Sequence, residues 1–349
     1  MKKNMHNLNK LSLLLLLAIV VFSLNAQDAR REFAQSYDVR EGVTLSMDTR
    51  YSDVEILAWE DNVVDILVEV EVEAPSDSRA REILEEARVE INRSGNTITV
   101  ETGWSEGSGK DVKKELHVTV RAPSYLNVDI ENSYGDLFVQ EISGLALLDL
   151  KYSNLKAGRL SRGDQEPYNR IEFAYSNGTI DEAGWIELEI AYSDMEINSS
   201  ERLFVESKYA KLNGAKAGRI ETEGTYDKYT FDEIGSFAAE LKYSGLKFGV
   251  LTRSLELESS YANVLIQNLS GEFESVDASL SYGNITMDVD NGTAFRLEGE
   301  SKYGKIRVGP EGNLNRMKDG PTVKVSGTVG SNPRATINVT TKYGNIDIR

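Results

Sequence analysis

The chain has 349 residues, with 39 basic and 56 acidic side chains, and a formal net charge of −17. It contains no cysteine, which excludes disulfide bonds and thiolate metal sites. The excess of acid argues against nucleic acid as a partner, because the phosphate backbone would be repelled.

The first 26 residues have the pattern of a secretory signal peptide. Lysines near the start precede an apolar run from Leu11 to Phe22, and the stretch Ser23-Leu24-Asn25-Ala26 follows, in which Leu24 is larger than the small residue usual at that position. The run is short for a membrane span, so we expect cleavage near Ala26 and no transmembrane segment afterwards; an uncleaved anchor helix is the alternative. Removing residues 1–26, which hold three lysines and no acid, leaves a charge of −20 and predicts an extracytoplasmic protein, periplasmic, outer-membrane-associated or secreted.

Residues 27–121 combine strands with one helix. Valine and glutamate alternate from Val68 to Glu73, which is typical of a strand with one face in water. The spacing then changes to that of an amphipathic helix over residues 77–88, with Ser76 or Asp77 as its N-cap and with apolar residues Ala80, Ile83, Leu84 and Ala87. We expect this segment to form a small α+β cap at the N-terminus of the following repeats.

Residues 122–349 hold most of a repeat that is anchored on tyrosine. From Tyr134 to Tyr303 successive anchor tyrosines are 17 to 23 residues apart. Each tyrosine is followed by a small residue or aspartate, and in ten of twelve cases an aliphatic residue or methionine stands three positions after it. The twelve anchors are Tyr51, Tyr134, Tyr152, Tyr175, Tyr192, Tyr209, Tyr226, Tyr243, Tyr261, Tyr282, Tyr303 and Tyr343.

The sequence of each repeat predicts two or three short strands joined by turns. Apolar residues alternate with charged ones on both sides of Tyr192, and the alternation changes phase at the Ser193-Asp194 pair. A unit of this size cannot bury its apolar face alone, so successive units must stack. The prediction is a mainly β fold, a β-solenoid of Tyr-[Gly/Ser]-x-[Leu/Ile/Val] coils; an antiparallel meander or sandwich is the alternative. Because Tyr192 shares its phase with Leu188 and Ile190, the tyrosines are expected to face the core as a structural ladder.

The order of these elements resembles a known group of bacterial proteins. The resemblance rests on the valine-glutamate strands, the single helix, a Gly-Asn hairpin, Arg121-Ala122-Pro123 and the Tyr-Gly-Asp/Asn repeats. Together they are similar to the adhesin-like families of β-strand-repeat proteins, and the similarity covers nearly the whole chain after residue 26. This resemblance implies a β-solenoid outside the cytoplasm and supplies no catalytic residues.

The chain is poor in residues that could catalyse a reaction or hold a metal. His117 is the only histidine after the leader, and the segment from Asp288 to Gly292 lacks the spaced third carboxylate and the terminal glutamate of a calcium loop. We therefore expect no catalytic site, no metal and no cofactor. A carboxylate pair for sugar cleavage is possible on such a scaffold, but 56 acids make close pairs inevitable.

Two segments that interrupt the period, Ser161–Asn169 and Gly309–Pro321, are candidate contact regions. The first contains Arg162, Gly163 and Asp164, a tripeptide known from cell-adhesion ligands that is also ordinary turn chemistry. Trp104, at the start of a glycine-rich loop, is a further candidate contact.

The sequence thus predicts a non-enzymatic, adhesin-like binding module of the cell envelope with an unknown envelope, glycan or protein ligand. One alternative is a structural or signalling-linked envelope protein without a specific ligand. A second alternative is a carbohydrate-active β-helix enzyme. An exposed aromatic stripe along the solenoid would favour binding, a uniformly charged surface would favour the structural role, and a groove with clustered acids and aromatics would favour the enzyme.

Overall fold

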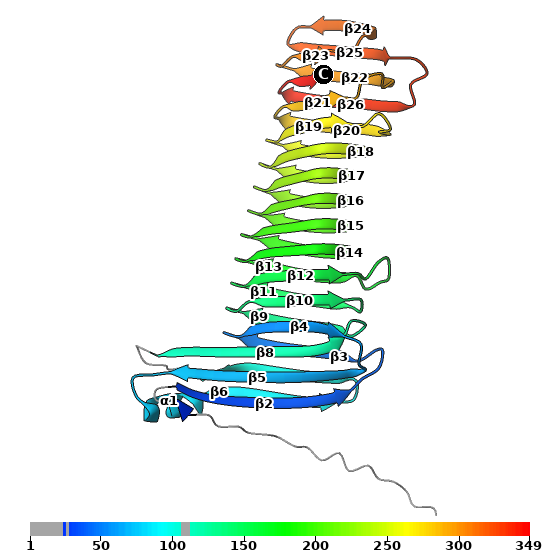
Figure 1. Ribbon diagram of the computed structural model, residues 1–349. Coiled ribbons are helices and arrows are strands. Elements are labelled where there is room, and N and C mark those ends of the chain that lie inside the picture. The colour runs from blue at the N-terminus through cyan, green and yellow to red at the C-terminus, as the bar shows by residue number, and fades with distance from the viewer. Residues whose placement is uncertain (1–23, 26–27, 106–111) are drawn as a thin grey trace, which may run out of the picture.

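The computed structural model describes residues 24–25, 28–105 and 112–349. In this part the chain forms a tall column of stacked strands on a wider N-terminal base (Figure 1). The predicted leader lies outside the described residues apart from residues 24–25, as does the middle of the glycine-rich loop, residues 106–111. No helix in the described ranges is long and apolar enough to cross a membrane.

The column is a β-solenoid, as predicted. In each coil one strand leads to a tyrosine, the chain bends, and a second strand follows on another face; we call these faces row A and row B. Neighbouring coils pair in parallel, as in β14 and β15, where Asn177 lies beside Asp194 and Ala191 beside Lys208. The antiparallel meander is therefore wrong for the column. Its strands are β9 Asn127–Ser133, β10 Leu137–Ile142, β11 Ala146–Lys151, β12 Asn154–Leu160, β13 Asn169–Ala174, β14 Asn177–Ala191, β15 Asp194–Lys208, β16 Lys211–Thr225, β17 Lys228–Lys242, β18 Gly245–Ser260, β19 Asn263–Leu269, β20 Ser275–Tyr282 and β21 Ile285–Val289.

Antiparallel strands and the helix α1 close the N-terminal end (Figure 1). Strand β5 pairs with β8 and β2, β6 pairs with β7, and α1 packs against β2 and β5. The predicted cap Ser76 accepts a hydrogen bond from the backbone N–H of Arg79, but the helix ends at Leu84 because the chain turns and enters β6 at Ala87. The elements are β1 Leu24–Asn25, β2 Asp28–Asp38, β3 Thr44–Arg50, β4 Asp53–Trp59, β5 Val63–Glu73, α1 Asp77–Leu84, β6 Ala87–Ser94, β7 Thr97–Trp104 and β8 Lys113–Pro123.

Chain order and spatial order differ at both ends of the column. Strands β3 and β4 pair in parallel with β7 and β8 on one side and with β9 and β10 on the other. The coil of Tyr51 therefore belongs to the column although it lies in the segment assigned to the cap. At the other end β26 and β27 lie between the coil of β20 and β21 and the coil of β22 and β23.

The C-terminal end is also closed by antiparallel strands. Strand β25 pairs with β22, and β24 pairs with β25. The predicted contact segment Gly309–Pro321 is therefore not a loop, since most of it is strand β24. The strands are β22 Phe295–Lys302, β23 Ile306–Val308, β24 Gly312–Asp319, β25 Thr322–Val329, β26 Ala335–Tyr343 and β27 Ile346–Ile348.

The core runs up the column between rows A and B. It consists of the alternate inward side chains of each strand, such as Leu188 and Ile190 in row A and Ile197 in row B, all of which are buried. The intervening side chains, including Glu187 and Glu189, point to solvent. Hydrophobic burial on every coil thus fixes the register in which the tyrosine bends align.

Candidate binding surface

The twelve tyrosines form one continuous stack on the outer edge of the column, which we call the tyrosine ridge. Neighbouring ring centroids are 4.5 to 5.1 Å apart, and neighbouring planes differ by at most 19°. In spatial order the stack is Tyr51, Tyr134, Tyr152, Tyr175, Tyr192, Tyr209, Tyr226, Tyr243, Tyr261, Tyr282, Tyr343 and Tyr303.

The expectation that these rings face the core is wrong. Their side chains are 38 to 57% exposed. Ten of the twelve have a positive φ between 52° and 65°, the left-handed conformation that a side chain ordinarily avoids. A left-handed residue breaks the alternation of the strand, so Tyr192 turns outward and Ser193, which is 4% exposed, takes the inward place.

Buried serines at the next position hold this bend. The Ser193 hydroxyl donates to the carbonyl oxygen of Ala191 at 2.8 Å and accepts the backbone N–H of Ser176 at 3.0 Å. Ser176 repeats both contacts, donating to Ala174 at 2.7 Å and accepting from Ser153 at 3.0 Å. Each of these two serines therefore joins the two arms of its own bend and links it to the preceding coil, which explains the serine after Tyr175 and Tyr192.

The stacking decides what the ridge offers to a ligand. The faces of an interior ring such as Tyr209 are covered by its neighbours, at centroid distances of 5.0 and 4.8 Å. The exposed part of each ring is therefore its edge, with the phenol hydroxyl. Ring edges carry partial positive charge, and phenol hydroxyls donate hydrogen bonds. Face-on stacking of sugars or bases is excluded along the interior of the ridge.

Two rows of side chains border the ridge. The residue before the tyrosine lies at the end of row A and the residue two after it at the start of row B. Cations recur in the first row: the Nζ atoms of Lys208, Lys302 and Lys342 lie 5.9, 5.5 and 5.7 Å from the centroid of the tyrosine that each precedes. The sequence contains a signal for these cations: a Lys-Tyr pair recurs, and it becomes visible when the repeats are aligned on tyrosine.

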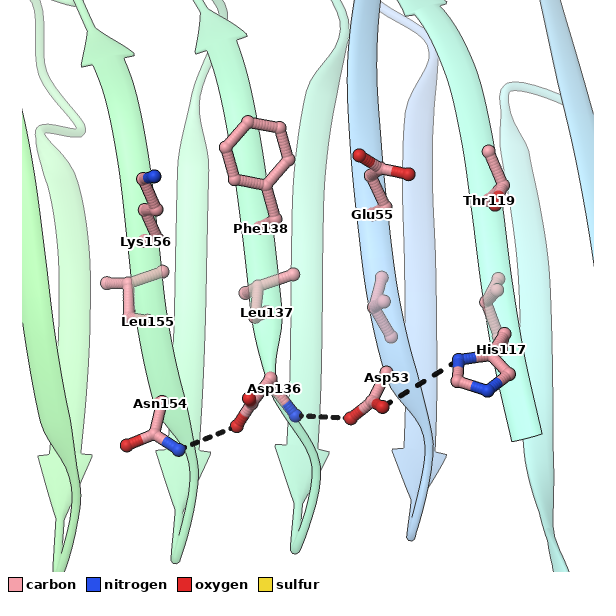
Figure 2. A pocket seen from close by; sticks show the side chains of 12 residues that line it. Asp53, Glu55, His117, Thr119, Asp136, Leu137, Phe138, Asn154, Leu155 and Lys156 are labelled. Carbon is pink, nitrogen blue, oxygen red and sulfur yellow. Dashed lines mark hydrogen bonds and ion pairs between the residues drawn. The ribbon is translucent and has the colours of Figure 1, made fainter. Parts of the chain in front are cut away.

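Row B contains a polar hollow of about 390 Å³ beside the N-terminal end of the ridge. Figure 2 shows four neighbouring strands, β12, β10, β4 and β8, with one polar residue from each in a line. The Asn154 amide donates to Asp136 Oδ1 at 2.7 Å, the Asp136 backbone N–H donates to Asp53 Oδ1 at 2.9 Å, and Asp53 Oδ2 lies 3.7 Å from His117 Nδ1.

This hollow brings together the only histidine of the described residues and three carboxylates, those of Asp53, Glu55 and Asp136. The His117–Asp53 distance of 3.7 Å is longer than a hydrogen bond, and both side chains are substantially exposed. Glu55, Thr119, Phe138 and Lys156 form the next outward positions (Figure 2). Within the described ranges no group of three or more potential ligands could hold a metal ion. The line of polar side chains extends the ridge border and shows no activated nucleophile.

None of the other candidate residues belongs to the stack of tyrosine rings. Arg162 donates from Nε to the carbonyl oxygen of Pro167 at 2.9 Å, so its charge braces the loop that contains Gly163 and Asp164. Trp104 is half-buried at the end of β7, with Lys114 Nζ 4.6 Å from a ring centroid, and is not the free contact expected. The segment Asp288–Gly292 is the end of β21 and a turn.

One coil replaces the buried serine by aspartate and places a polar group in the core. Asp227 accepts the backbone N–H of Ala210 at 2.9 Å and the Ser207 hydroxyl at 3.0 Å. The Tyr229 hydroxyl shares Ser207 and lies 2.8 Å from Thr222 Oγ1. Burial raises the pKa of the Asp227 carboxyl above its ordinary value and raises the pKa of the Tyr229 phenol to about 12.

Comparison with known proteins gives similarity at the level of solved structures alone. No family model matches, and no curated protein matches. A Bacteroides fragilis protein named "putative adhesin" is 11% identical, with 91% of this chain and 97% of that chain covered and a TM-score of 0.33. A Parabacteroides merdae "putative adhesin" is 9% identical over 91% and 96%, with a TM-score of 0.35. A Parabacteroides distasonis "Putative lipid binding protein" is 8% identical over 91% and 96%, with a TM-score of 0.37. At these identities and TM-scores the similarity assigns neither a role nor a ligand.

The ridge geometry predicts an unusual order of stability among variants. Tyr192→Ala removes two stacked contacts and leaves a β-carbon in a left-handed backbone, so we expect a loss of about 1–3 kcal/mol. Tyr192→Gly removes the same ring but relieves the backbone, so it should be more stable than the alanine variant by about 0.5–1 kcal/mol. Urea denaturation measures both. The core control Phe173→Ala should cost about 3–5 kcal/mol; an equal loss for Tyr192→Ala would contradict the exposed position.

Because the Asp227 carboxyl is buried, we predict that Asp227→Asn stabilises the folded protein by an amount that depends on pH. Since the folded pKa is raised, the contribution of Asp227 to stability is full below its unfolded pKa and is lost as pH rises through the folded value. The amide keeps an acceptor for Ala210 and cannot ionise. Urea midpoints at pH 3 and pH 7 should therefore show a growing advantage of the variant toward pH 7, with exposed Asp232→Asn as the charge-matched control. An advantage that shrinks toward neutral pH would show that the folded protein needs the ionised carboxylate.

Proposed function

We propose that the protein is a non-enzymatic, adhesin-like binding module that holds an extended polymer along its tyrosine ridge. The observation that carries this proposal is the row of twelve exposed, stacked tyrosines on one edge of the column. A soluble monomer rarely keeps a contiguous aromatic surface of this length free of a binding role. The geometry is that of the exposed aromatic stripe that favours binding over a purely structural role.

The ridge is suited to a linear partner. Its hydroxyls recur at each coil step of about 5 Å, the spacing of hydrogen-bonded strands, so one repeating chain can contact many coils in register. Each contact is weak because the phenols are exposed to water, but contacts in series raise the effective concentration of the next one. A compact ligand would engage only one or two rings.

The expected location belongs to the same proposal. A leader over residues 1–26 would place the ridge outside the cytoplasm, at the cell envelope or beyond it, where extended polymers are abundant. The segment 27–121 would serve mainly as the cap of the column formed by residues 122–349. The loop of Arg162, Gly163 and Asp164 is a second candidate contact away from the ridge.

Binding should be lost when the ridge is interrupted. Tyr175→Ala, Tyr192→Ala and Tyr209→Ala, combined in one protein, remove three neighbouring rings from the middle of the stack. We expect about tenfold weaker binding to an immobilised panel of linear polysaccharides, neutral, carboxylated and sulfated, because the multivalent contact is cut in two. Surface plasmon resonance measures the affinity, and circular dichroism verifies that the variant remains folded.

A matched control replaces three tyrosines outside the stack, Tyr37, Tyr125 and Tyr168, by alanine. This control should bind like the unmodified protein. If a folded ridge variant keeps full affinity for every polysaccharide that the unmodified protein binds, the ridge is a structural device and the proposal fails. Degradation of a polysaccharide by the purified protein would instead support the β-helix enzyme.

A further inference from the structure

We infer that the C-terminal half of the ridge, from Tyr209 to Tyr303, binds a linear acidic polysaccharide through its carboxylate or sulfate groups. This inference rests on the proposed function, since it names the class of polymer that the same ridge takes. The overall charge of −17 does not describe this edge of the molecule.

The charged side chains in the two border rows differ on either side of Tyr209. In the N-terminal half acids and bases are mixed, and the row B border holds Asp53, Asp136 and Asp194. From Tyr209 onward the two border rows contain seven exposed lysines and no acid: Lys208, Lys211, Lys228, Lys242, Lys302, Lys305 and Lys342. The C-terminal half is therefore a basic strip on an acidic protein.

The lysines stand on both sides of the rings. Lys208 and Lys242 end row A strands, with Thr225 in register between them, whereas Lys211 and Lys228 begin row B strands and are direct neighbours. Within the described residues only Lys211 of the seven has a carboxylate within 4.0 Å, Asp194 Oδ2 at 2.7 Å. The tyrosine edges thus lie in a channel of positive potential that follows the axis of the column.

The strip selects for anionic oxygen. Ring edges and phenol hydroxyls favour a negatively charged acceptor between them, and the lysines on either side add charge-assisted hydrogen bonds. The seven rings of this half are separated by steps of 4.5 to 5.0 Å. One pyranose unit of an extended polysaccharide is about as long as one such step, so acidic groups can meet successive coils.

The neighbouring face of row A restricts the ligand to the ridge. Glu206, Glu223, Glu240 and Glu258 lie side by side on successive strands, two positions before the lysine row. Their negative charges repel an anionic polymer that leaves the edge. A nucleic acid fits less well, because its bases need free ring faces, which the stacked neighbours cover.

The test measures binding of sodium polygalacturonate to the full protein by isothermal titration calorimetry, at low and at physiological salt. The variant Lys208→Gln, Lys228→Gln, Lys242→Gln removes three unpaired charges and keeps every tyrosine. We expect affinity to fall about tenfold at low salt, as the sum of three screened charge contacts. The control Lys216→Gln, Lys318→Gln, Lys324→Gln makes the same change of charge away from the ridge and should bind like the unmodified protein.

Binding measurements with two other polymers test the class of ligand. Their outcomes also distinguish a failure of this inference from a failure of the proposed function. Neutral dextran should bind more weakly than polygalacturonate, and inorganic polyphosphate should not compete effectively. Unchanged affinity of the lysine variant, or equal binding of dextran, would overturn the acidic-polysaccharide assignment while the tyrosine variants still test the ridge. Tighter binding of polyphosphate than of polygalacturonate would overturn the choice of polysaccharide. Loss of affinity in the control variant as well would show that only net charge matters.

Discussion

The structure depends on one constraint, the in-register parallel stacking of coils with a left-handed tyrosine at ten of the twelve bends. Backbone pairing fixes the step between coils, and a buried serine after the tyrosine holds the bend in coils such as those of Tyr175 and Tyr192. The tyrosine occupies the strained position, and its ring regains stabilisation by stacking on the rings above and below. Because a stacked tyrosine recurs in every coil, the rings form a continuous surface feature on the scale of the whole column.

The period and the alternation of apolar residues predicted the solenoid correctly, because both follow from burial of one face per strand. The same reasoning placed Tyr192 in the core, since it assumed that the strand alternation continues to the bend. A left-handed residue reverses the side on which its side chain emerges, and alternation alone does not reveal it. The Ser193 that follows was the available signal, because a small residue that can pair with the backbone suits the buried place.

Other features had no signal in a single sequence. Repeats that resemble one another give no indication that β26 and β27 lie between earlier coils, and this insertion reverses the order of Tyr303 and Tyr343 in the stack. Net charge concealed the basic strip, because carboxylates spread over the flat faces outnumber lysines gathered at one edge. If the residues are aligned by their position relative to tyrosine instead of being counted, the lysines of the ridge border are separated from the carboxylates of the flat faces.

Nitration of tyrosines by tetranitromethane, mapped by mass spectrometry with and without polygalacturonate, tests the central claim most directly. Without polymer the ridge tyrosines should react, whereas Tyr229, which is 1% exposed, should not. With polymer the account predicts protection that is concentrated between Tyr209 and Tyr303 and weaker at Tyr51 and Tyr134. Ridge tyrosines as unreactive as Tyr229, or bound polymer that protects only residues away from the ridge, would contradict it.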